Sequence, residues 1–418
     1  DHHPCERMSQ QPNIFLFSVI LGTIFMLLDA YVLGHWMGFV RRKSMNPWWH
    51  RSMWIVAALM AALYWVVVYQ RHFFRMNGVE VVLFGLVSFW YLPKLGIVPV
   101  LLLRDLLRLV RRVSWRTEKS PEVPTPPVEG RRAFLGTTAW SMASVPYILV
   151  GDGMWRTIYD FQTIPVELAI PKLPRAFDGM RIAQISDVHA GSFPDHRPFQ
   201  EVRRILEMLK PDMIVITGDF VNAKPDEMSV IAREMAQLKA PYGVLASLGN
   251  HDHYNTPREH DELVRTIRSL NVDLLVNEHR RIKEGGSSLI IAGTDNTGLR
   301  QNYARLDRAL DGVMDDEATI LLAHDPTFWD AQVVGATPID VTLSGHTHGG
   351  QFGVQLLGFE WSPAQYVYKQ WAGLYAAGEQ QLYVNRGIGT VGPPLRIGIP
   401  PEITLFTLRA ASITDRFA

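Results

Sequence analysis

The chain has 418 residues, with 41 Lys and Arg against 41 Asp and Glu, so its formal net charge is zero at pH 7. This balance gives no indication of nucleic-acid binding, and we expect no nucleic-acid partner. The single cysteine, Cys5, excludes an internal disulfide and a metal site built from several thiolates.

Four apolar runs dominate the first 150 residues, at positions 14–34, 53–69, 79–103 and 133–150. A helix needs about 20 apolar residues to cross a bilayer, so these runs predict four membrane-spanning helices. Buried helices of a soluble protein are the alternative, which three such runs within 90 residues disfavour. Pro93 and Lys94 interrupt the third run, which leaves open whether it is one span or a re-entrant pair.

The Lys and Arg residues between these runs predict the orientation in the membrane. The segment before the first run holds one of them, and the next three segments hold four, two and eight. Cytoplasmic loops carry the excess of basic residues, so the second and fourth segments are predicted to be cytoplasmic. The chain is then a multi-pass inner (plasma) membrane protein whose C-terminal part is periplasmic or otherwise extracytoplasmic. A re-entrant third run would reverse this orientation.

Residues 1–116 form the predicted transmembrane region with three spans. It ends in a basic amphipathic segment, residues 104–116, which we expect along the anionic inner surface. Residues 117–132 contain four prolines and predict a stiff cytoplasmic linker before the fourth span at 133–150. The linker ends in Arg131 and Arg132, either a twin-arginine export signal or two further charges on the inner side.

Short β-rich runs alternate with helical stretches between residues 178 and 410. The runs, which end in polar or glycine-containing turns, lie at 180–186, 213–217, 243–248, 319–323 and 339–344. This pattern predicts an α/β domain, preceded by a lead-in at 151–177 and followed by a tail at 411–418. Functional groups of such a domain are expected in the loops at the strand ends.

Side chains that bind metals close these predicted strands in five motifs, SDVH, GDFVN, GNHDH, AHDP and GHTHGG. Their polar residues are Asp187, His189, Asp219, Asn222, Asn250, His251, Asp252, His324, His346 and His348. Each motif alone is typical of a turn, but five in order are difficult to explain by turn preference. Carboxylate, imidazole and amide ligands without sulfur suit Mn, Fe or Zn, and a pair of such ions can clamp an in-line displacement.

In order and spacing these motifs resemble the calcineurin-like metallophosphoesterase family over residues 178–410. GHTHGGQ, with the later VNRGIGT and PPEI, is similar to the YkuE-type and YaeI-type membrane-associated branch. The apolar region resembles that of transmembrane proteins with a metallophosphoesterase domain. The resemblance implies a helical membrane domain followed by a four-layer α/β/β/α sandwich, and a hydrolase for phosphoric esters or anhydrides with two divalent metal ions.

The resemblance also implies roles for the motif residues. One metal is assigned to Asp187, His189, Asp219 and His348, and the other to Asp219 as the bridge, Asn250, His324 and His346. His251 is implied as a general acid or phosphate-stabilising group. Many members have an aspartate that orients this histidine at the position of Asn222, so either Asn222 or Asp252 is expected to orient His251 here.

Aromatic residues crowd the segment that follows the GHTHGG turn. Trp361, Tyr366 and Trp371 are predicted to contact the substrate, because Trp and Tyr also favour the bilayer interface. A packed loop without such a role is the alternative. The predicted partners are the bilayer and a phosphate-containing, amphipathic lipid.

Three functions remain open at this point. The first is a membrane-anchored phosphodiesterase or pyrophosphatase for a lipid-linked or envelope substrate on the outer face. The second is a cytoplasm-facing hydrolase of the UDP-2,3-diacylglucosamine type. The third is a non-enzymatic membrane receptor, which is disfavoured because no implied ligand position holds a residue that cannot bind metal.

Overall fold

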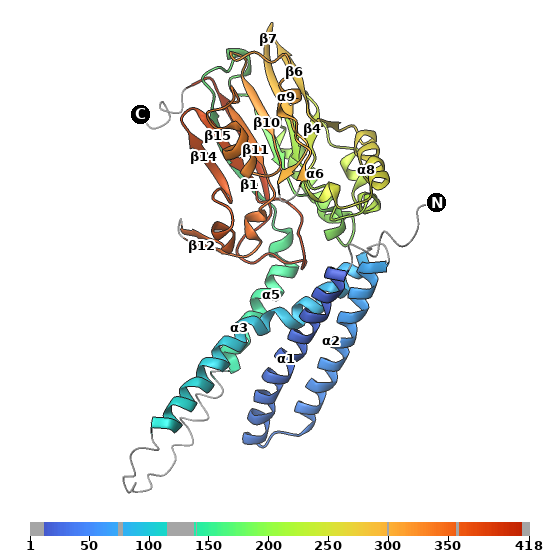
Figure 1. Ribbon diagram of the computed structural model, residues 1–418, viewed down its shortest axis with the longest axis vertical. Coiled ribbons are helices and arrows are strands. Elements are labelled where there is room, and N and C mark those ends of the chain that lie inside the picture. Colours follow the sequence, from blue (N-terminus) through green and yellow to red (C-terminus); the bar gives the residue numbers. More distant parts are fainter. Residues whose placement is uncertain are drawn as a thin grey trace. The chain divides into compact units, whose positions relative to one another are not determined.

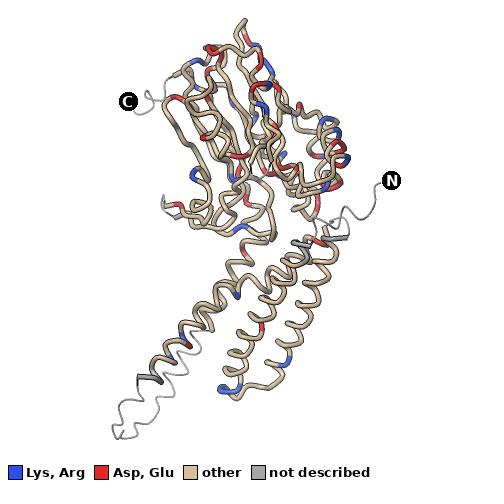
Figure 2. The backbone as a smooth tube through the Cα atoms, viewed as in Figure 1, with Lys and Arg blue, Asp and Glu red and all other residues tan. Residues whose placement is uncertain are grey.

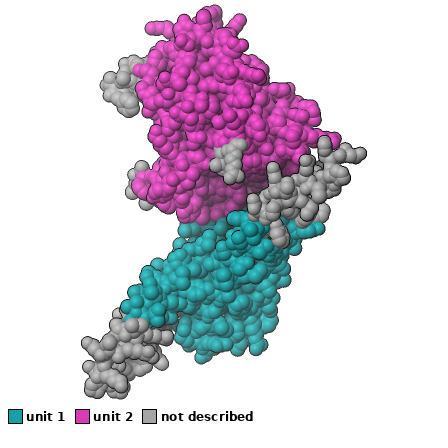
Figure 3. Space-filling view, viewed as in Figure 1, with its two compact units in different colours: residues 1–74, 82–152 teal, residues 75–81, 153–418 magenta. Residues whose placement is uncertain are grey.

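The computed structural model describes residues 12–73, 78–114, 138, 140–298, 301–356 and 359–411. It divides the chain into two compact units, which Figure 3 colours separately. The membrane unit comprises residues 1–74 and 82–152, and the second unit, named the catalytic unit after the activity that the resemblance implies, comprises residues 75–81 and 153–418. Charged residues are sparse along the long helices and frequent in the catalytic unit (Figure 2).

Among its described residues, the membrane unit contains three helices that are long and apolar enough to span a bilayer. They are α1 (Pro12–Arg42), α2 (Trp48–Phe73) and α3 (Gly78–Ser114), with candidate spans at Leu16–Arg42, Trp48–Gln70 and Gly78–Val110. These helices confirm the first three predicted spans. Helix α5 (Val145–Trp155) covers the end of the fourth predicted run. Residues 133–137 and 139 of that run lie outside the described residues, as do the Pro-rich linker and the twin arginines.

Helix α3 is continuous through Pro93 and Pro99, which favours a single span over a re-entrant pair. Its last turns also include residues 104–114, so the described part of the basic amphipathic segment extends the third helix instead of forming a separate surface helix. Proline is tolerated inside membrane helices where other groups satisfy the freed backbone. Pro93 has no N–H to donate to the carbonyl of Phe89, four residues earlier, and next to it the ammonium of Lys94 donates to the carbonyl of Trp90 at 2.7 Å.

Two charged residues in the apolar helices pair with each other. Lys94 Nζ of α3 lies 2.8 Å from Asp29 Oδ1 of α1, and both side chains are buried. The indole nitrogen of Trp90 donates to the same carboxylate oxygen at 3.1 Å. A single charge within a membrane helix is costly, and the pairing explains why these two residues are tolerated.

In the described part of the catalytic unit, the strands form two six-stranded sheets (Figure 1). Sheet A has the order β1-β16-β2-β3-β4-β5 and sheet B the order β14-β15-β11-β10-β7-β6. The strands are β1 (Gln162–Ala169), β2 (Arg181–Ile185), β3 (Met213–Thr217), β4 (Val244–Ser247), β5 (Asp273–Leu274), β6 (Glu278–Glu284), β7 (Ser287–Gly293), β10 (Thr319–Leu322), β11 (Val341–Ser344), β14 (Gly373–Ala377), β15 (Gln380–Val384) and β16 (Glu402–Arg409). Two short hairpins add β8 (Thr297–Gly298) with β9 (Gln301–Asn302), and β12 (Val354–Leu356) with β13 (Phe359–Trp361).

Helices cover the outer faces of both sheets and complete the predicted four-layer α/β/β/α architecture. Helices α6 (Arg197–Leu209), α7 (Ala232–Met235) and α8 (Pro257–Ser269) pack on sheet A. The π-helix at Trp329–Val333 and the short α9 (Leu306–Ala309) pack on sheet B. A further cluster of apolar side chains fills the space between the two sheets. Strands such as β3 are therefore fully buried, with packed side chains on both faces.

The catalytic domain begins earlier than the sequence predicted. Strand β1 lies in the segment expected as a lead-in, yet it pairs in parallel with β16 from Gln162↔Glu402 to Ala169↔Arg409. It is an edge strand, so Pro165 costs no hydrogen bond to a second neighbour. Its half-exposed alternation and its proline gave a weaker strand signal than the buried runs.

Candidate metal centre

The predicted metal ligands follow five parallel strands of the two sheets. They stand after β2 (Asp187, His189), β3 (Asp219), β4 (Asn250), β10 (His324) and β11 (His346, His348). β2, β3 and β4 are parallel neighbours in sheet A, and β10 and β11 are parallel neighbours in sheet B. The fold therefore brings the carboxyl ends of these strands, and all seven residues, to one place.

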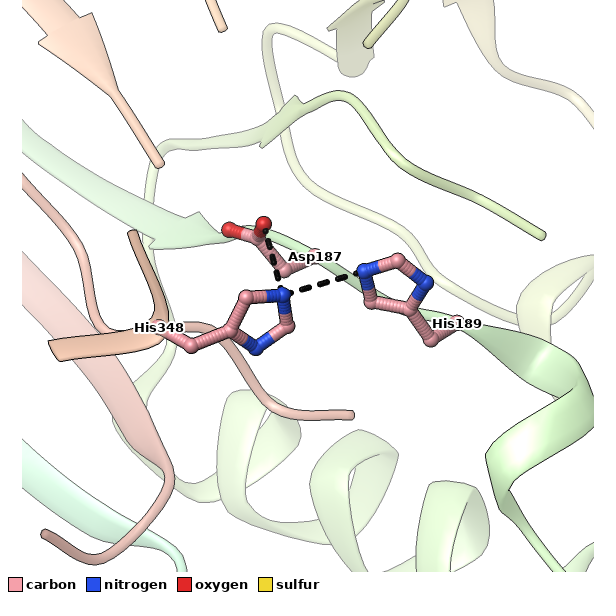
Figure 4. A group of neighbouring side chains, drawn as sticks. All are labelled: Asp187, His189 and His348. Atoms are coloured by element: carbon pink, nitrogen blue, oxygen red, sulfur yellow. Dashed lines mark hydrogen bonds and ion pairs between the residues drawn. The ribbon is translucent and has the colours of Figure 1, made fainter. Parts of the chain in front are cut away.

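The first cluster consists of Asp187, His189 and His348, which point toward one another in Figure 4. His348 Nε2 lies 3.1 Å from His189 Nε2 and 3.3 Å from Asp187 Oδ1. The Nδ1 atoms of both histidines are buried without a hydrogen-bond partner in the described structure. Both rings thus direct Nε2 into the cluster.

The second cluster consists of Asn250, His324 and His346 around the carboxylate of Asp219. Asn250 Oδ1 lies 2.8 Å from His346 Nδ1 and 3.2 Å from His324 Nε2. The other nitrogen of His324, Nδ1, donates to the carbonyl of Thr217 at 2.7 Å. That bond fixes the ring so that Nε2 points into the cluster.

Asp219 lies between the two clusters. Its Oδ2 is 3.1 Å from His324 Nε2 of the second cluster and 3.5 Å from His189 Nε2 of the first. Its Oδ1 accepts a hydrogen bond from the backbone N–H of His251 at 2.8 Å, which holds the carboxylate in place. One oxygen therefore faces both clusters.

The backbone at the site adopts a conformation that non-glycine residues rarely use. Asp187, His189, Asp219, His346 and His348 all have positive φ, between 43° and 73°. Such strain persists only where the surroundings enforce it, and it concentrates at functional sites.

Glycines allow the loops around the site to approach closely enough to hold these residues in their strained backbone conformation. A Cβ on Gly345 would lie 2.2 Å from Asp187 Oδ2, and one on Gly249 would lie 2.3 Å from Asp219 Oδ1.

Burial and charge shift the pKa values of the site in opposite directions. Burial raises the pKa of Asp187 to about 6, against the lowering effect of His324. Burial lowers the pKa of His189 to about 3, which favours the neutral imidazole that binds metals. Burial also opposes protonation of His324, but the carboxylates of Asp219 and Asp187 outweigh it and raise that pKa to about 10.

This donor set fits divalent metal ions. Imidazole nitrogens from different strands converge at 3.1 Å with carboxylate oxygens beside them, and the buried carboxylates supply negative charge that a cation would compensate. Oxygen and nitrogen donors without sulfur suit borderline divalent ions. The assignment of each residue to a particular ion remains a prediction.

His251 lies beside the first cluster, with its ring 4.7 Å from that of His189. Its Nδ1 lies 2.7 Å from the backbone carbonyl of Asn222. The side-chain amide of Asn222, which the sequence suggested as the orienting group, is not the partner of this ring. Because any residue at 222 supplies a carbonyl, the motif position alone did not reveal this contact.

Asp252 has a different task from the predicted one of orienting His251. Its fully buried carboxylate accepts hydrogen bonds from the backbone N–H groups of Asp219 (3.0 Å), Phe220 (2.8 Å) and Gly249 (2.9 Å). It therefore ties the loop after β3 to the loop after β4. Asp252 positions the bridging residue and does not contact the ring of His251 in the described structure.

The three predicted substrate contacts lie differently with respect to the metal centre. Trp371 contacts the turn between His346 and His348 through its backbone, since its carbonyl accepts a hydrogen bond from Thr347 Oγ1 at 2.7 Å. Trp361 and Tyr366 contact each other, with the indole nitrogen 3.3 Å from the hydroxyl. No hydrogen bond or ring contact among the described residues joins Trp361 or Tyr366 to a ligand.

Two tyrosines outside the predicted set do contact ligands. Tyr368 Oη lies 3.0 Å from His346 Nε2, the nitrogen that faces away from Asn250. Tyr254 Oη accepts from the Asn250 amide at 2.7 Å, and its ring lies 4.5 Å from that of His251. Tyr254 follows Asn250 by four residues in a helical turn, a spacing that predicts contact. The separation of 22 positions between His346 and Tyr368 gives no such signal.

Two family models match the chain. One, described as calcineurin-like phosphoesterase, matches residues 180–350. The other, described as probable calcineurin-like phosphoesterase, transmembrane domain, matches residues 12–158.

Curated relatives are named either as a transmembrane protein with a metallophosphoesterase domain or as a metallophosphoesterase. A "transmembrane protein with metallophosphoesterase domain" from Danio rerio is 29% identical over 260 residues, covering 60% of this chain and 58% of that protein. The metallophosphoesterase YkuE of Bacillus subtilis is 33% identical over 246 residues, covering 57% of this chain and 82% of that protein. An uncharacterized metallophosphoesterase of Aquifex aeolicus is 30% identical, covering 63% of this chain and 97% of that protein.

The chain matches little more than half the length of its transmembrane relatives, 58% of the Danio rerio protein and 56% of the one from Bos taurus. It matches most of YkuE and nearly all of the Aquifex aeolicus protein, and the described fold has the expected membrane helices and paired sheets. The chain therefore belongs to the calcineurin-like metallophosphoesterase family, as a member with a transmembrane domain.

Proposed function

We propose that the chain hydrolyses a phosphodiester or pyrophosphate with two divalent metal ions, and that its substrate is a lipid-linked or envelope phosphate on the outer face of the inner membrane. The observation that carries the proposal is the position of Asp219 Oδ2, within 3.5 Å of histidines from both clusters. Two cations held close together need an anion between them, and this carboxylate is suitably placed.

Each cluster would hold one ion. Asp187, His189 and His348 would bind the first and Asn250, His324 and His346 the second, with Asp219 shared. Bound divalent ions would act as Lewis acids and offset the negative charge that develops on the phosphoryl oxygens. The oxygen and nitrogen donors support Mn, Fe or Zn.

His251 is placed to move a proton. Its Nδ1 donates to the Asn222 carbonyl, which leaves Nε2 to carry the proton that the leaving oxygen requires. The backbone bond fixes the tautomer and the ring orientation. A carbonyl stabilises an imidazolium less than a carboxylate would, so we expect His251 to matter most for poor leaving groups.

The Lys and Arg distribution supports an outward-facing catalytic unit. The segments before and between the predicted spans hold one, four, two and eight basic residues. The continuous α3 supports a single crossing by the third run, on which the predicted orientation depends. Reporter fusions after Arg116 and after Ala418 test it. Green fluorescent protein should fluoresce only at the first site, and alkaline phosphatase should be active only at the second.

A substrate screen tests the reaction itself. The full chain, purified in detergent or nanodiscs, is assayed with defined Mn²⁺, Zn²⁺ or Fe²⁺ against nitrophenyl phosphodiesters, lipid-linked pyrophosphates and nucleotide-linked lipids. We expect turnover of a lipid-linked phosphate. Absence of hydrolysis with every metal would contradict the proposal, and a preference for a nucleotide-diphosphate lipid with the reversed fusion pattern would indicate a cytoplasm-facing enzyme.

A further inference from the structure

Exposed aromatic and aliphatic side chains gather on one segment of the catalytic unit, here called the apolar loop (residues 352–356 and 359–367). Phe359, Tyr366 and Val367 are 60%, 76% and 75% exposed, and Phe352 and Val354 are exposed as well. A cluster of this kind on a protein surface usually marks a binding surface.

Strand pairing gives the loop an amphipathic character. In the β12–β13 hairpin, Val354 stands opposite Trp361, and Phe359 is two residues from Trp361 on the same face. Gln355 and Glu360 stand opposite each other on the other face and are hydrogen-bonded at 2.9 Å. The hairpin thus has one apolar face and one polar face.

The polar face carries little free charge. Arg386 Nη2 lies 3.0 Å from Glu360 Oε1, so the carboxylate nearest the apolar residues is neutralised by a partner. In the following turn, Lys369 pairs with Asp330 at 3.0 Å. Among the described residues of the loop, no unpaired carboxylate would oppose contact with a lipid surface.

Backbone hydrogen bonds connect the loop to the residues that follow the fourth predicted span. The carbonyl of Gly153, three residues after the apolar run 133–150, accepts a hydrogen bond from the N–H of Arg396 at 3.2 Å. The next residue, Ile397, donates to the carbonyl of Gln351 at 2.8 Å and accepts from the N–H of Gly353 at 2.9 Å. Two short links therefore join Gly153 to the start of the apolar loop, far from the β6–β7 hairpin at the opposite end of the unit (Figure 1).

We propose that the apolar loop lies in the interfacial region of the bilayer that anchors the same chain. The occupant of the patch is lipid, because the patch is hydrogen-bonded to the residues that follow the fourth predicted span and carries Trp361 and Tyr366. These residue types favour the depth at which an apolar ring meets hydrated headgroups. Trp155, the last residue of α5, is exposed at the same exit and has the same preference.

The loop also leads from this surface to the metal centre. Tyr368 directly follows the exposed Val367, and its hydroxyl contacts His346. If the proposed hydrolysis is correct, a substrate whose phosphate lies at the membrane surface would reach the second cluster along this loop. The substrate would then belong to the class of phosphates attached to a lipid. This inference about the substrate rests on the proposed function, whereas the inference of membrane contact does not.

Site-specific fluorescence tests the membrane contact directly. Because Cys5 is the only cysteine, a Cys5→Ser background permits one label at a time in the full chain, through Phe359→Cys, Val367→Cys or the control Met314→Cys. Met314 is also exposed, but it precedes β10, whose other end carries His324. Each variant carries an environment-sensitive nitrobenzoxadiazole label and is placed, one copy per disc, in phosphatidylcholine nanodiscs.

We expect labels at 359 and 367 to emit at shorter wavelength than the label at 314. Spin-labelled lipid should quench them severalfold more than the control, and aqueous iodide severalfold less. Iodide quenching equal to that at 314 would place the loop in water and overturn the proposal. Protection from both quenchers would mean that protein covers the patch, and would overturn it equally.

The readout does not depend on hydrolysis. Lipid quenching without turnover of any lipid phosphate would refute the proposed substrate and leave the membrane contact standing. Turnover of a lipid phosphate with a water-exposed loop would do the reverse.

Discussion

Replacing Tyr368 with phenylalanine removes one hydroxyl from the metal centre and leaves the ring. The hydroxyl lies 3.0 Å from His346 Nε2, on the side of the imidazole opposite the Asn250 contact, and the ring packs edge-on at 5.4 Å. Partners of this kind fix the orientation of a ligating histidine, and their loss weakens metal binding by about 10–100-fold. The expected cost in metal-binding free energy is about 1.4–2.8 kcal/mol, since each tenfold is about 1.4 kcal/mol.

The loss should be confined to one of the two ions, because Tyr368 contacts a ligand of the second cluster only. Metal content after equilibration with buffered free Mn²⁺ or Zn²⁺ should follow two steps, and only one of them should shift to higher free metal in the Tyr368→Phe variant. Tyr366→Phe is a matched control: it deletes a hydroxyl from the same loop that contacts Trp361 and no ligand. Unchanged binding of both ions in Tyr368→Phe, or an equal shift in Tyr366→Phe, would refute the reasoning.

Three further predictions follow from specific contacts. His251→Ala should keep both metals but lose roughly 10²–10⁴-fold in rate, less with a nitrophenolate leaving group, and metal loss would make His251 a ligand. Asn222→Ala should lower the rate far less than His251→Ala in the same assay, because the backbone carbonyl of residue 222 holds the His251 ring. An equal loss of rate would show that the Asn222 side chain takes part in catalysis. Asp29→Asn or Lys94→Met should each lower the melting temperature in nanodiscs, since breaking a buried ion pair costs about 3–5 kcal/mol, whereas the double variant should recover most of it; a double variant as unstable as the singles would contradict the pairing.

The sequence predicted the parts of this structure that depend on local pattern. Buried β-rich runs such as 213–217 ended where the polar motifs began, and parallel strands necessarily gather those ends. Asp187 and His346 could therefore be placed at one site, although 159 positions separate them. Strand β1 was missed because an edge strand with Pro165 lacks the continuous apolar run of a central strand.

The remaining contacts depend on how distant segments pack. Tyr368 reaches His346 only because of the path of the loop between them, and no spacing rule predicts that path. The sequence offered Asp252 as one of two residues that could orient His251, and its actual partners could not be predicted because they are backbone N–H groups, which nearly every residue has. Asp29 and Lys94 appeared in the sequence as separate interruptions, and only the packing of α1 against α3 shows that they pair.

The shared carboxylate of Asp219 is the central claim, and metal content per chain tests it most directly. The full chain and the Asp219→Asn variant are loaded with the same metal, freed of excess by gel filtration, and measured by inductively coupled plasma mass spectrometry beside their turnover of a nitrophenyl phosphodiester. The full chain should retain two ions, and the variant fewer than two, with activity lower by orders of magnitude, because an amide cannot offset the repulsion between two cations. A variant that keeps two ions and near-normal turnover would contradict the bridge.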